Sequence, residues 1–289
     1  MTCKVSFIGL GVMGYPMAGY ISKAGHGVTV YNRTKAKAEK WVKEFKGNLA
    51  ETPMEAAKDC DFIFTCVGND NDLREVTLGE KGLFKTAKKG AVYVDNTTAS
   101  ADIARELYKK AKAKEFDFLD APISGGQAGA EGGTLTVMVG GDDAPFKKAE
   151  PVIDSYSKKI KLLGPSGSGQ LTKMVNQICI AGLVQGLSEA INFGLNAGLN
   201  MHDVIEVISK GAAQSWQMEN RHKTMIDDKF DYGFAVDWMR KDLKIAMDEA
   251  KKNNSPLPIT KIIDQYYAEV QKMGGERWDT SSLIKRFRK

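Results

Sequence analysis

Short apolar segments alternate with amphipathic stretches through roughly the first 165 residues of the chain. Seven of these segments predict β-strands, several of them buried on both faces because they are apolar throughout: 5–8, 28–31, 62–67, 92–95, 118–119, 135–139 and 160–163. Helical patterns separate the early strands. One of them, 53–58, begins with Thr52 and Glu55 at capping-box spacing and with Pro53 at the first helical position. This alternation predicts a Rossmann-like α/β fold, with a doubly wound and mostly parallel sheet.

The pattern changes after a glycine- and serine-rich segment, 164–169. From Gln170 to about Asn196 there is no proline and apolar residues recur at helical spacing, which predicts a helix about 40 Å long. Further helical segments begin at Met201, Trp216, Trp238 and Pro256, without a strand pattern among them. We therefore expect an α/β domain over residues 1–164 and an all-helical domain over 165–289 that begins with a long interdomain helix.

Composition and charge exclude several classes of protein. With 43% hydrophobic and 27% charged residues, the chain has the composition of a soluble globular protein, and no apolar run approaches the length of a membrane span. The N-terminus enters a strand pattern without a signal-peptide core. The four cysteines show no metal-ligand spacing and are interpreted as reduced thiols, so we expect a cytoplasmic protein without a metal site.

The net charge of +5 raises the question of nucleic acid. The lysines, however, are spread along helical stretches with acidic residues within or beside them, as in 35–46 and 109–114, and no basic patch with interleaved aromatic residues is present. The sequence therefore predicts solvated helix faces, with neither nucleic acid nor membrane as a partner.

A G-x-G-x-x-G motif, residues 9–14, follows the first predicted strand and opens a helical stretch. The next strand ends about twenty residues later, which is the context of the dinucleotide-binding fingerprint. Gly9 would allow the tight turn, Gly11 the approach of a pyrophosphate, and Gly14 the close packing of helix on strand, with the helix N-terminus facing the phosphates. Val12 and Met13 complete this predicted cofactor loop. A glycine-rich turn without a ligand is the alternative, which the strand–turn–helix context disfavours.

The residues after the second predicted strand bear on the choice of cofactor. NAD sites usually carry an acidic residue there, whereas this chain has Asn32, Arg33 and Thr34. A guanidinium can pair with a 2′-phosphate and stack on adenine. We therefore expect NADP, with NAD as the weaker alternative if Arg33 is a surface residue only.

Two segments are candidates for the chemistry. Ser124, Gly125 and Gly126 follow a predicted strand and could form an anion cradle for a substrate carboxylate, although the same residues also suit a structural turn. On the long helix, Lys173 and Asn176 lie three residues apart on one face, and Gln177 lies four residues from Lys173. A lysine in a cleft can transfer protons, whereas a snorkelling lysine near a helix start is the structural alternative. None of the three histidines lies near either segment.

Four ordered motifs together resemble the β-hydroxyacid dehydrogenase family, which includes 3-hydroxyisobutyrate dehydrogenase, L-serine 3-dehydrogenase and tartronate semialdehyde reductase. The similarity runs from Lys4 to about Ile284. The motifs are the extended glycine signature 7–18, the segment 120–126, Gly167-x-Gly169-x-x-x-Lys173-x-x-Asn176, and the segment 240–243. The resemblance implies a hydride-transferring oxidoreductase that acts on a small β-hydroxy acid and assembles as a homodimer or homotetramer.

The resemblance also implies roles for individual residues. Lys173 would transfer the proton, and Lys241 would reach the cofactor region. Thr98 occupies the place of a threonine that contacts the nicotinamide ribose. Val67 and Gly68 replace the usual Leu-Pro, so only backbone contacts carry over there. Gln177 stands where some members have a second asparagine, which leaves open whether Asn176 or Gln177 contacts the substrate.

The sequence constrains the identity of the substrate less than that of the cofactor. Trp216 resembles the tryptophan that lines the pocket of 3-hydroxyisobutyrate and L-serine dehydrogenases, although it could also be a packing residue. We therefore expect a substrate of the 3-hydroxyisobutyrate or L-serine type. The alternatives are an NADPH-dependent reductase of glyoxylate, succinic semialdehyde or tartronate semialdehyde, and a catalytically inactive NADP-binding scaffold or sensor. The retained Lys173 argues against the scaffold, and Asn176-Gln177 with the chain length argues against a 6-phosphogluconate dehydrogenase.

Overall fold

The computed structural model describes residues 2–288, which form two compact units that meet between Lys173 and Met174. The sequence pattern places the boundary earlier, between residues 164 and 165. The difference is the first turn of the long helix α8 (Ser168–Asn196), which belongs to the first unit because its backbone and Gln170 are hydrogen-bonded there.

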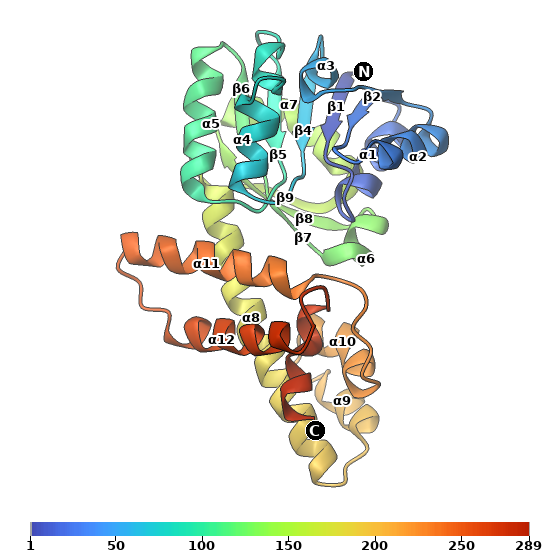
Figure 1. Cartoon of the computed structure of the whole chain (residues 1–289), viewed down its shortest axis with the longest axis vertical. Coiled ribbons are helices and arrows are strands. Elements are labelled where there is room, and N and C mark those ends of the chain that lie inside the picture. Colours follow the sequence, from blue (N-terminus) through green and yellow to red (C-terminus); the bar gives the residue numbers. More distant parts are fainter. Residues whose placement is uncertain (1, 289) are drawn as a thin grey trace. The chain divides into compact units, whose positions relative to one another are not determined.

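A single sheet organises the first unit (Figure 1). Its strands run in the order β3-β2-β1-β4-β5-β6-β8-β7, and β9 pairs with β8. The first six of these are mutually parallel, whereas β8 runs antiparallel to β6 and β7. The predicted mostly parallel, Rossmann-like sheet is therefore confirmed. The strands are β1 (Lys4–Ile8), β2 (Gly27–Tyr31), β3 (Asn48–Leu49), β4 (Phe62–Thr65), β5 (Val92–Asp95), β6 (Asp117–Asp120), β7 (Ile123–Ser124), β8 (Leu135–Gly141) and β9 (Ser157–Leu162).

Helices cover both faces of the sheet, because alternate residues of each strand point to opposite sides. Phe7 and Phe64 enter one core, where their rings stack, while Ile8 and Ile63 enter the other. The helices are α1 (Gly14–Lys23), α2 (Lys35–Phe45), α3 (Pro53–Ala57), α4 (Asp70–Leu78), α5 (Ala101–Ala113), α6 (Gly126–Glu131) and α7 (Asp143–Ile153), with short 3₁₀ turns at Leu83–Lys85 and Asp154–Tyr156. The predicted cap of α3 is present, since the Thr52 hydroxyl accepts from the Glu55 amide at 3.1 Å.

Two strands were not anticipated by the hydrophobic pattern. β3 and β7 contain two residues each, too few to show a periodicity of two. β9 begins at Ser157, three residues before the predicted start, because Lys158 and Lys159 are exposed at this edge of the sheet and break the apolar run.

The second unit is helical throughout its described residues, apart from one isolated bridge between Ala235 and Asp279. It contains most of α8, α9 (Met201–Ile208), α10 (Trp216–Ile226), α11 (Val236–Lys252), α12 (Pro258–Lys272) and a terminal 3₁₀ segment (Thr280–Phe287). Two apolar clusters hold these helices together, one between α8, α11 and α12 and one between α8, α9 and α10. α11 and α12 each begin two residues from the predicted start.

α8 is long and apolar enough to pass for a membrane span by length and composition, and it is the one such helix within residues 2–288. The core helix of a folded domain meets the same criteria. Polar residues such as Gln185 and Ser188 interrupt its apolar run, and both are buried against the rest of the chain.

Candidate active site

The glycine loop after β1 has the geometry that its sequence predicts. Gly9 adopts φ +100°, and a Cβ there would lie 2.3 Å from the Cys66 carbonyl oxygen. A Cβ on Gly14 would lie 2.0 Å from the Gly9 carbonyl oxygen. Neither position tolerates a side chain. Gly11 is different, because a Cβ there would meet nothing within 4 Å, so no protein atom explains the glycine. An open position of this kind fits the close approach of a cofactor pyrophosphate.

The N-terminus of α1 has no side-chain cap. Its N-cap residue, Met13, makes no side-chain capping bond, and the first turn carries no acidic residue. Val12 is 57% exposed beside it. Backbone N–H groups at such a terminus, together with the positive end of the helix dipole, attract phosphate. Residues 9–14 therefore fit a dinucleotide.

The three residues after β2 have distinct roles. The Asn32 side chain accepts from the Leu10 amide at 2.9 Å and donates to the Thr34 carbonyl at 2.9 Å, so it ties the glycine loop to the start of α2. The Thr34 hydroxyl makes no capping bond. The Arg33 guanidinium, with its side chain 86% exposed, pairs with Asp72 on α4 at 3.2 Å. Exposed pairs of this kind stabilise by at most about 1 kcal/mol, so Arg33 can exchange this partner for a phosphate at little cost.

The ends of β4 and β5 are joined by buried polar contacts. The Val67 amide donates to the Thr97 hydroxyl at 3.0 Å. Asp95 accepts from the Thr97 amide at 3.0 Å and from the Thr65 hydroxyl at 2.7 Å, and burial raises its pKa to about 7. Val67 and Gly68 are half-buried, as is Thr98, whereas the two residues before Thr98 are buried. Of this segment, Thr98 is thus the side chain placed to meet a ligand.

Gln170, in the first turn of α8, holds the backbone on both sides of Thr98. Its side chain accepts from the Ala99 amide at 3.0 Å and donates to the Thr97 carbonyl at 2.7 Å. Gln170 is fully buried. No role was predicted for it, although its place three positions before Lys173 in the same motif was an available signal. It positions Thr98 relative to the start of α8.

Asp120, at the end of β6, caps the N-terminus of α8. Its carboxylate accepts from the amides of Gly167 at 2.7 Å and Gln170 at 3.0 Å. Burial raises its pKa to about 6, against the opposing effect of these backbone hydrogen bonds. Gly169 is required because a Cβ there would lie 2.5 Å from the Asp120 carbonyl oxygen. The glycines of the predicted catalytic motif therefore allow α8 to begin against β6.

The predicted carboxylate cradle lies between β7 and α6. Gly125 and Gly126 have φ of +135° and +61°, in the region that favours glycine. Gly125 is the N-cap residue of α6, and Ser124 before it is half-buried. The Tyr20 hydroxyl on α1 donates to the Glu131 carbonyl at 2.7 Å and so fixes the far end of α6. Only glycine adopts these φ values without strain, and the segment remains the candidate for the anion cradle.

Lys173 follows one turn into α8 and is only 7% exposed. A buried lysine loses hydration, and it is held here on a helix whose first turn is fixed by Asp120 and Gln170. Such a group suits proton transfer better than an exposed ammonium does. Asn176 lies on the same face of α8, three residues on.

In the second unit, three polar side chains from α8 and α11 form a chain of hydrogen bonds. Asn176 Nδ2 donates to Gln177 Oε1 at 2.8 Å, and Gln177 Nε2 donates to Asp242 Oδ2 at 2.6 Å. The second oxygen of Asp242 lies 3.1 Å from Lys241 Nζ. Both Gln177 and Asp242 are 2% exposed. The structure thus joins three of the predicted site residues through Asp242, a residue that the sequence analysis left without a role.

Trp216 opens α10, where its ring lies 4.8 Å from the Arg221 guanidinium and is 45% exposed. The exposed ring fits a pocket-lining role.

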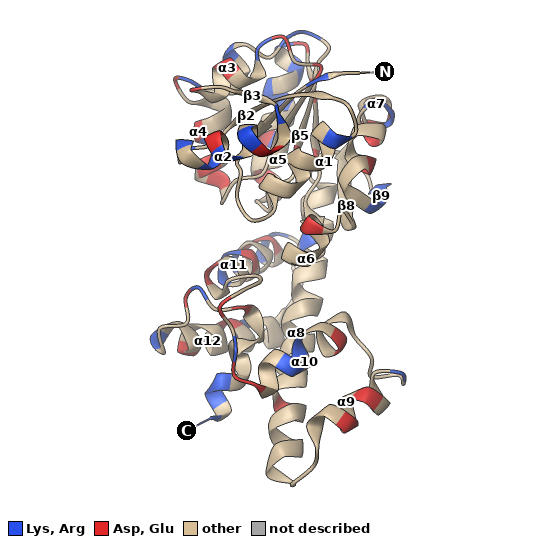
Figure 2. Ribbon diagram, turned by 90° about the vertical axis from the view of Figure 1, so that its right-hand side faces the viewer, with Lys and Arg blue, Asp and Glu red and all other residues tan. Residues whose placement is uncertain are grey.

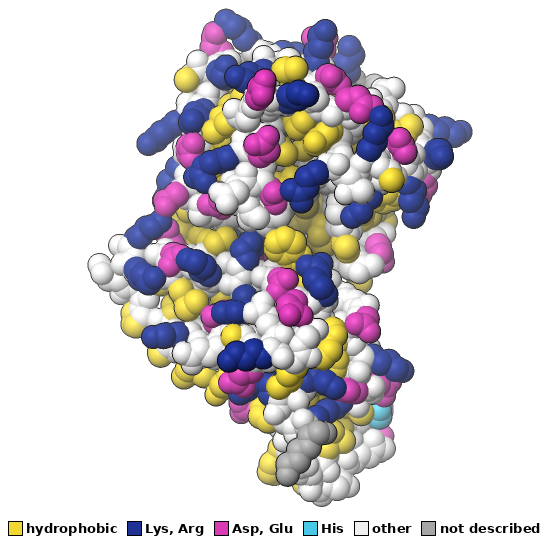
Figure 3. All heavy atoms as spheres, viewed as in Figure 1, with side chains coloured by type: hydrophobic (Ala, Val, Ile, Leu, Met, Phe, Trp, Pro, Cys, Tyr) yellow, Lys and Arg dark blue, Asp and Glu magenta, His cyan; other side chains and the backbone are white. Residues whose placement is uncertain are grey.

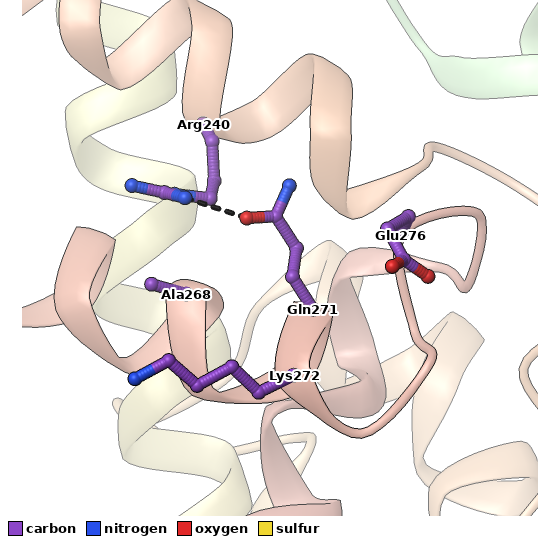
Figure 4. Close-up of a pocket in the computed structure, with 5 residues that line it drawn as sticks. All are labelled: Arg240, Ala268, Gln271, Lys272 and Glu276. Carbon is purple, nitrogen blue, oxygen red and sulfur yellow. Dashed lines mark hydrogen bonds between the residues drawn. The ribbon is translucent and has the colours of Figure 1, made fainter.

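A separate pocket lies between α11 and α12, lined by Arg240, Ala268, Gln271, Lys272 and Glu276 (Figure 4). Arg240 there pairs with Asp264 at 2.9 Å and donates to Gln271 at 2.5 Å. This pocket contains none of the predicted site residues, and its Arg240 and Gln271 are engaged in hydrogen bonds between α11 and α12.

Charge on the surface is mixed. Lysines and arginines lie among acidic side chains over the face shown in Figure 3. Many are paired, as in the bonds of Lys112 with Asp117 and Asp142. Among residues 2–288 no cluster of three or more His, Cys, Asp or Glu side chains could hold a metal ion.

Comparison with known proteins accounts for both units. Residues 4–164 match the NAD binding domain of 6-phosphogluconate dehydrogenase, and residues 167–287 match the family described as NAD-binding of NADP-dependent 3-hydroxyisobutyrate dehydrogenase. An uncharacterized oxidoreductase of Shewanella frigidimarina is 62% identical over 99% of this chain and 98% of its own. The 2-hydroxy-3-oxopropionate reductase of Escherichia coli is 34% identical over 97% of this chain and 96% of its own.

The solved structures agree. The 3-hydroxyisobutyrate dehydrogenase of Mycobacterium tuberculosis, determined with L-serine, superposes with a TM-score of 0.89 at 27% identity and covers 100% of both chains. The predicted family is thereby confirmed. The chain belongs to the β-hydroxyacid dehydrogenases, which are NAD(P)-dependent oxidoreductases acting on CH–OH groups.

Proposed function

We propose that this enzyme uses NADP to interconvert a small β-hydroxy acid, of the 3-hydroxyisobutyrate or L-serine type, and its semialdehyde. The observation that carries the proposal is Lys173, a buried lysine on a helix start that Asp120 and Gln170 anchor in the same unit as the glycine loop. The solved relative with L-serine supports this substrate class.

Each predicted site residue has a role in the proposed reaction. Ser124, with the amides of Gly125 and Gly126, binds the substrate carboxylate and so orients the β-carbon. Lys173 accepts the hydroxyl proton during oxidation and returns it to the carbonyl oxygen during reduction. The nicotinamide, when bound, supplies the hydride acceptor or donor. Gly9, Gly11, Val12, Met13 and Gly14 would hold the cofactor's pyrophosphate and Thr98 its ribose, and the family resemblance assigns Lys241 to the cofactor as well.

The purified protein, mixed with NADP⁺ or NAD⁺ and a panel of β-hydroxy acids, tests the proposal. The panel contains L-serine, both 3-hydroxyisobutyrates, 3-hydroxypropionate and glycerate. We expect NADPH absorbance to appear with 3-hydroxyisobutyrate or L-serine. Absence of turnover in both directions, with cofactor binding intact, would favour the inactive scaffold and overturn the proposal.

A second candidate function is reduction of a semialdehyde such as tartronate semialdehyde. The Escherichia coli relative favours it, since that protein is 34% identical and is named a 2-hydroxy-3-oxopropionate reductase. Oxidation of NADPH by tartronate semialdehyde, glyoxylate or succinic semialdehyde, without activity on the hydroxy acids, would select this branch.

Arg33 should decide the preference for NADP over NAD. We expect Arg33→Ala to raise the KM for NADPH about tenfold or more, because a charge-assisted bond to the 2′-phosphate is worth about 1.5–3 kcal/mol. The KM for NADH, which lacks that phosphate, should change less than about twofold. Lys35→Ala removes a nearby exposed cation that pairs with Glu51 and serves as the control. Equal changes for both cofactors would contradict the role of Arg33.

We propose a homodimer or homotetramer assembled through one face of α8. This face presents Cys179, Gly182, Leu183, Gly186 and Phe193 to solvent. Phe193 is 74% exposed, and α8 carries little charge along its length (Figure 2). Burying such a face against a second copy removes apolar surface from water.

Light scattering tests the assembly. We expect a wild-type mass of two or four times 31.7 kDa, and a shift towards 31.7 kDa in Phe193→Glu, which places a charge in the interface. Phe193→Leu keeps most of the apolar area and should retain the wild-type mass. A wild-type monomer would refute the proposal.

We place the enzyme in the cytoplasm. All four cysteines are free thiols, which fits a reducing compartment. Fractionation of the native host, followed by detection of the chain in the cytosolic fraction, tests this assignment.

A further inference from the structure

The hydrogen-bonded chain from Asp242 to Asn176 has a defined direction, because its first member can only accept. A carboxylate carries no N–H or O–H, so the atom of Gln177 that lies 2.6 Å from Asp242 Oδ2 must be the amide nitrogen. Gln177 therefore presents its oxygen to the next member. Asn176 must then present its own nitrogen, which lies 2.8 Å from that oxygen.

The orientation of the Asn176 amide determines whether it can donate or accept a hydrogen bond at the site. The oxygen and the nitrogen of the Asn176 amide point in different directions. Reversing the amide would exchange the positions of the hydrogen-bond donor and the acceptor. With Nδ2 committed to Gln177, the Oδ1 branch of Asn176 is the one directed elsewhere. An amide oxygen accepts a hydrogen bond from an ammonium or a hydroxyl. Lys173 lies one turn before Asn176 on the same face of α8, and the substrate hydroxyl is its proposed reaction partner.

We propose that Asp242 and Gln177 are positioning residues that hold Asn176 with its carbonyl oxygen as a hydrogen-bond acceptor for the Lys173 ammonium and the substrate hydroxyl. This inference rests on the proposed function. Gln177 acts through Asn176, and both ends of its amide are occupied within the chain. The arrangement also explains why glutamine suits this position, since its side chain reaches α11 while it bonds its neighbour on α8.

Burial makes the arrangement rigid. Gln177 and Asp242 are each 2% exposed, so water cannot readily replace the bond between them. A polar group left without a partner in such a place costs about 1–3 kcal/mol. The carboxylate has further support from Lys241, whose ammonium lies 3.1 Å from the second oxygen. Reversal of the Gln177 amide would set its oxygen against a carboxylate oxygen, which is repulsive.

A polarity swap tests the proposal. Gln177→Glu alone sets two carboxylates against each other, and we expect it to lower kcat about tenfold or more, in keeping with the size of general acid–base contributions. Asp242→Asn alone keeps an amide oxygen that can still accept from Gln177, so it should lose less. In the double variant, Asp242→Asn with Gln177→Glu, the side chain at 242 can donate to the carboxylate at 177, which still accepts from Asn176 Nδ2. The double variant should recover to within about threefold of wild type, a non-additivity that signals direct coupling.

Two further readouts separate positioning from structural support. The KM for NADPH should change little in Gln177→Glu, since Asn176 acts on the substrate, while kcat carries the loss; the Asp242 variants also alter the partner of Lys241 and are compared by kcat alone. The control is Asp237→Asn in the second unit, because Gln271 Nε2 donates to Asp237 Oδ1 at 2.6 Å, a bond of the same kind away from α8. We expect that control to leave kcat unchanged.

Each outcome decides between defined alternatives. Losses that multiply in the double variant, without recovery, overturn the inference while the proposed function stands. A wild-type enzyme inactive on every hydroxy acid and semialdehyde of the panel refutes the proposed function itself. Should Asp242→Asn fail to fold, Gln177→Met removes both bonds without adding a charge, and it should lower kcat by the same factor as Gln177→Glu. Wild-type kcat in that variant overturns the inference.

Discussion

Lys173→Ala should abolish turnover while leaving cofactor binding intact. Proton transfer by a positioned side chain contributes about 10²–10⁴-fold to a rate, and we expect kcat to fall by about 10³-fold. Steady-state kinetics with the best substrate of the panel measures kcat, and quenching of tryptophan fluorescence measures the dissociation constant of NADPH.

A charged but non-titrating side chain provides the control for Lys173. Arginine keeps the positive charge yet does not release its proton in proteins. Lys173→Arg should therefore be as inactive as Lys173→Ala if the proton is transferred, and largely active if the lysine only neutralises the substrate carboxylate. A kcat within about tenfold of wild type in either variant would contradict the role of Lys173 as the proton donor and acceptor.

Asp120→Ala should give the largest loss of stability among single substitutions near the site. The change leaves the amides of Gly167 and Gln170 buried without an acceptor. An unsatisfied buried donor costs about 1–3 kcal/mol, and loss of a helix cap alone about 1 kcal/mol, so we expect the free energy of unfolding to fall by about 3 kcal/mol. Urea denaturation at pH 8 measures it, since burial raises the pKa of Asp120 to about 6 and the carboxylate is ionised there.

Asp143→Ala is the matched control for Asp120. Asp143 lies in the first turn of α7, but its side chain is 65% exposed and pairs only with Lys147, four residues on. Exposed pairs of this spacing contribute about 0.3–0.5 kcal/mol. If Asp120→Ala unfolds at the same urea concentration as Asp143→Ala, the cap does not hold α8 as described. Because α8 carries Lys173, Asp120→Ala should also lower kcat.

Local signals were sufficient for the parts of the fold that local chemistry decides. The glycine loop could be predicted because the turn, the open position for a ligand and the helix start all involve residues 9–14, and Gly9 and Gly14 have steric reasons at the adjoining strand end and within the loop. The cap of α3 depends on Thr52 and Glu55 alone. The long helix α8 could be predicted from apolar residues that recur at helical spacing without an intervening proline. These features need no knowledge of distant residues.

The two shortest strands could not be predicted, because each depends on pairing with another strand and not on its own residues. β7 consists of Ile123 and Ser124, and it exists because β8 pairs with it, not because its residues show a strand pattern. β3 likewise depends on its pairing with β2. The edge strand β9 begins with exposed lysines, whose solvation hides the start of the strand.

The sequence by itself determined the two-part architecture and the glycine loop, and its motif singled out Lys173 as the proposed reacting lysine. Only the tertiary structure decided which polar residues support that lysine and its neighbours. Asp120 meets Gln170 across 50 positions, and Gln177 meets Asp242 across 65. Hydrogen bonds between residues so far apart leave no periodicity in the chain, because their partners are brought together by strand order and helix packing rather than by spacing along the sequence.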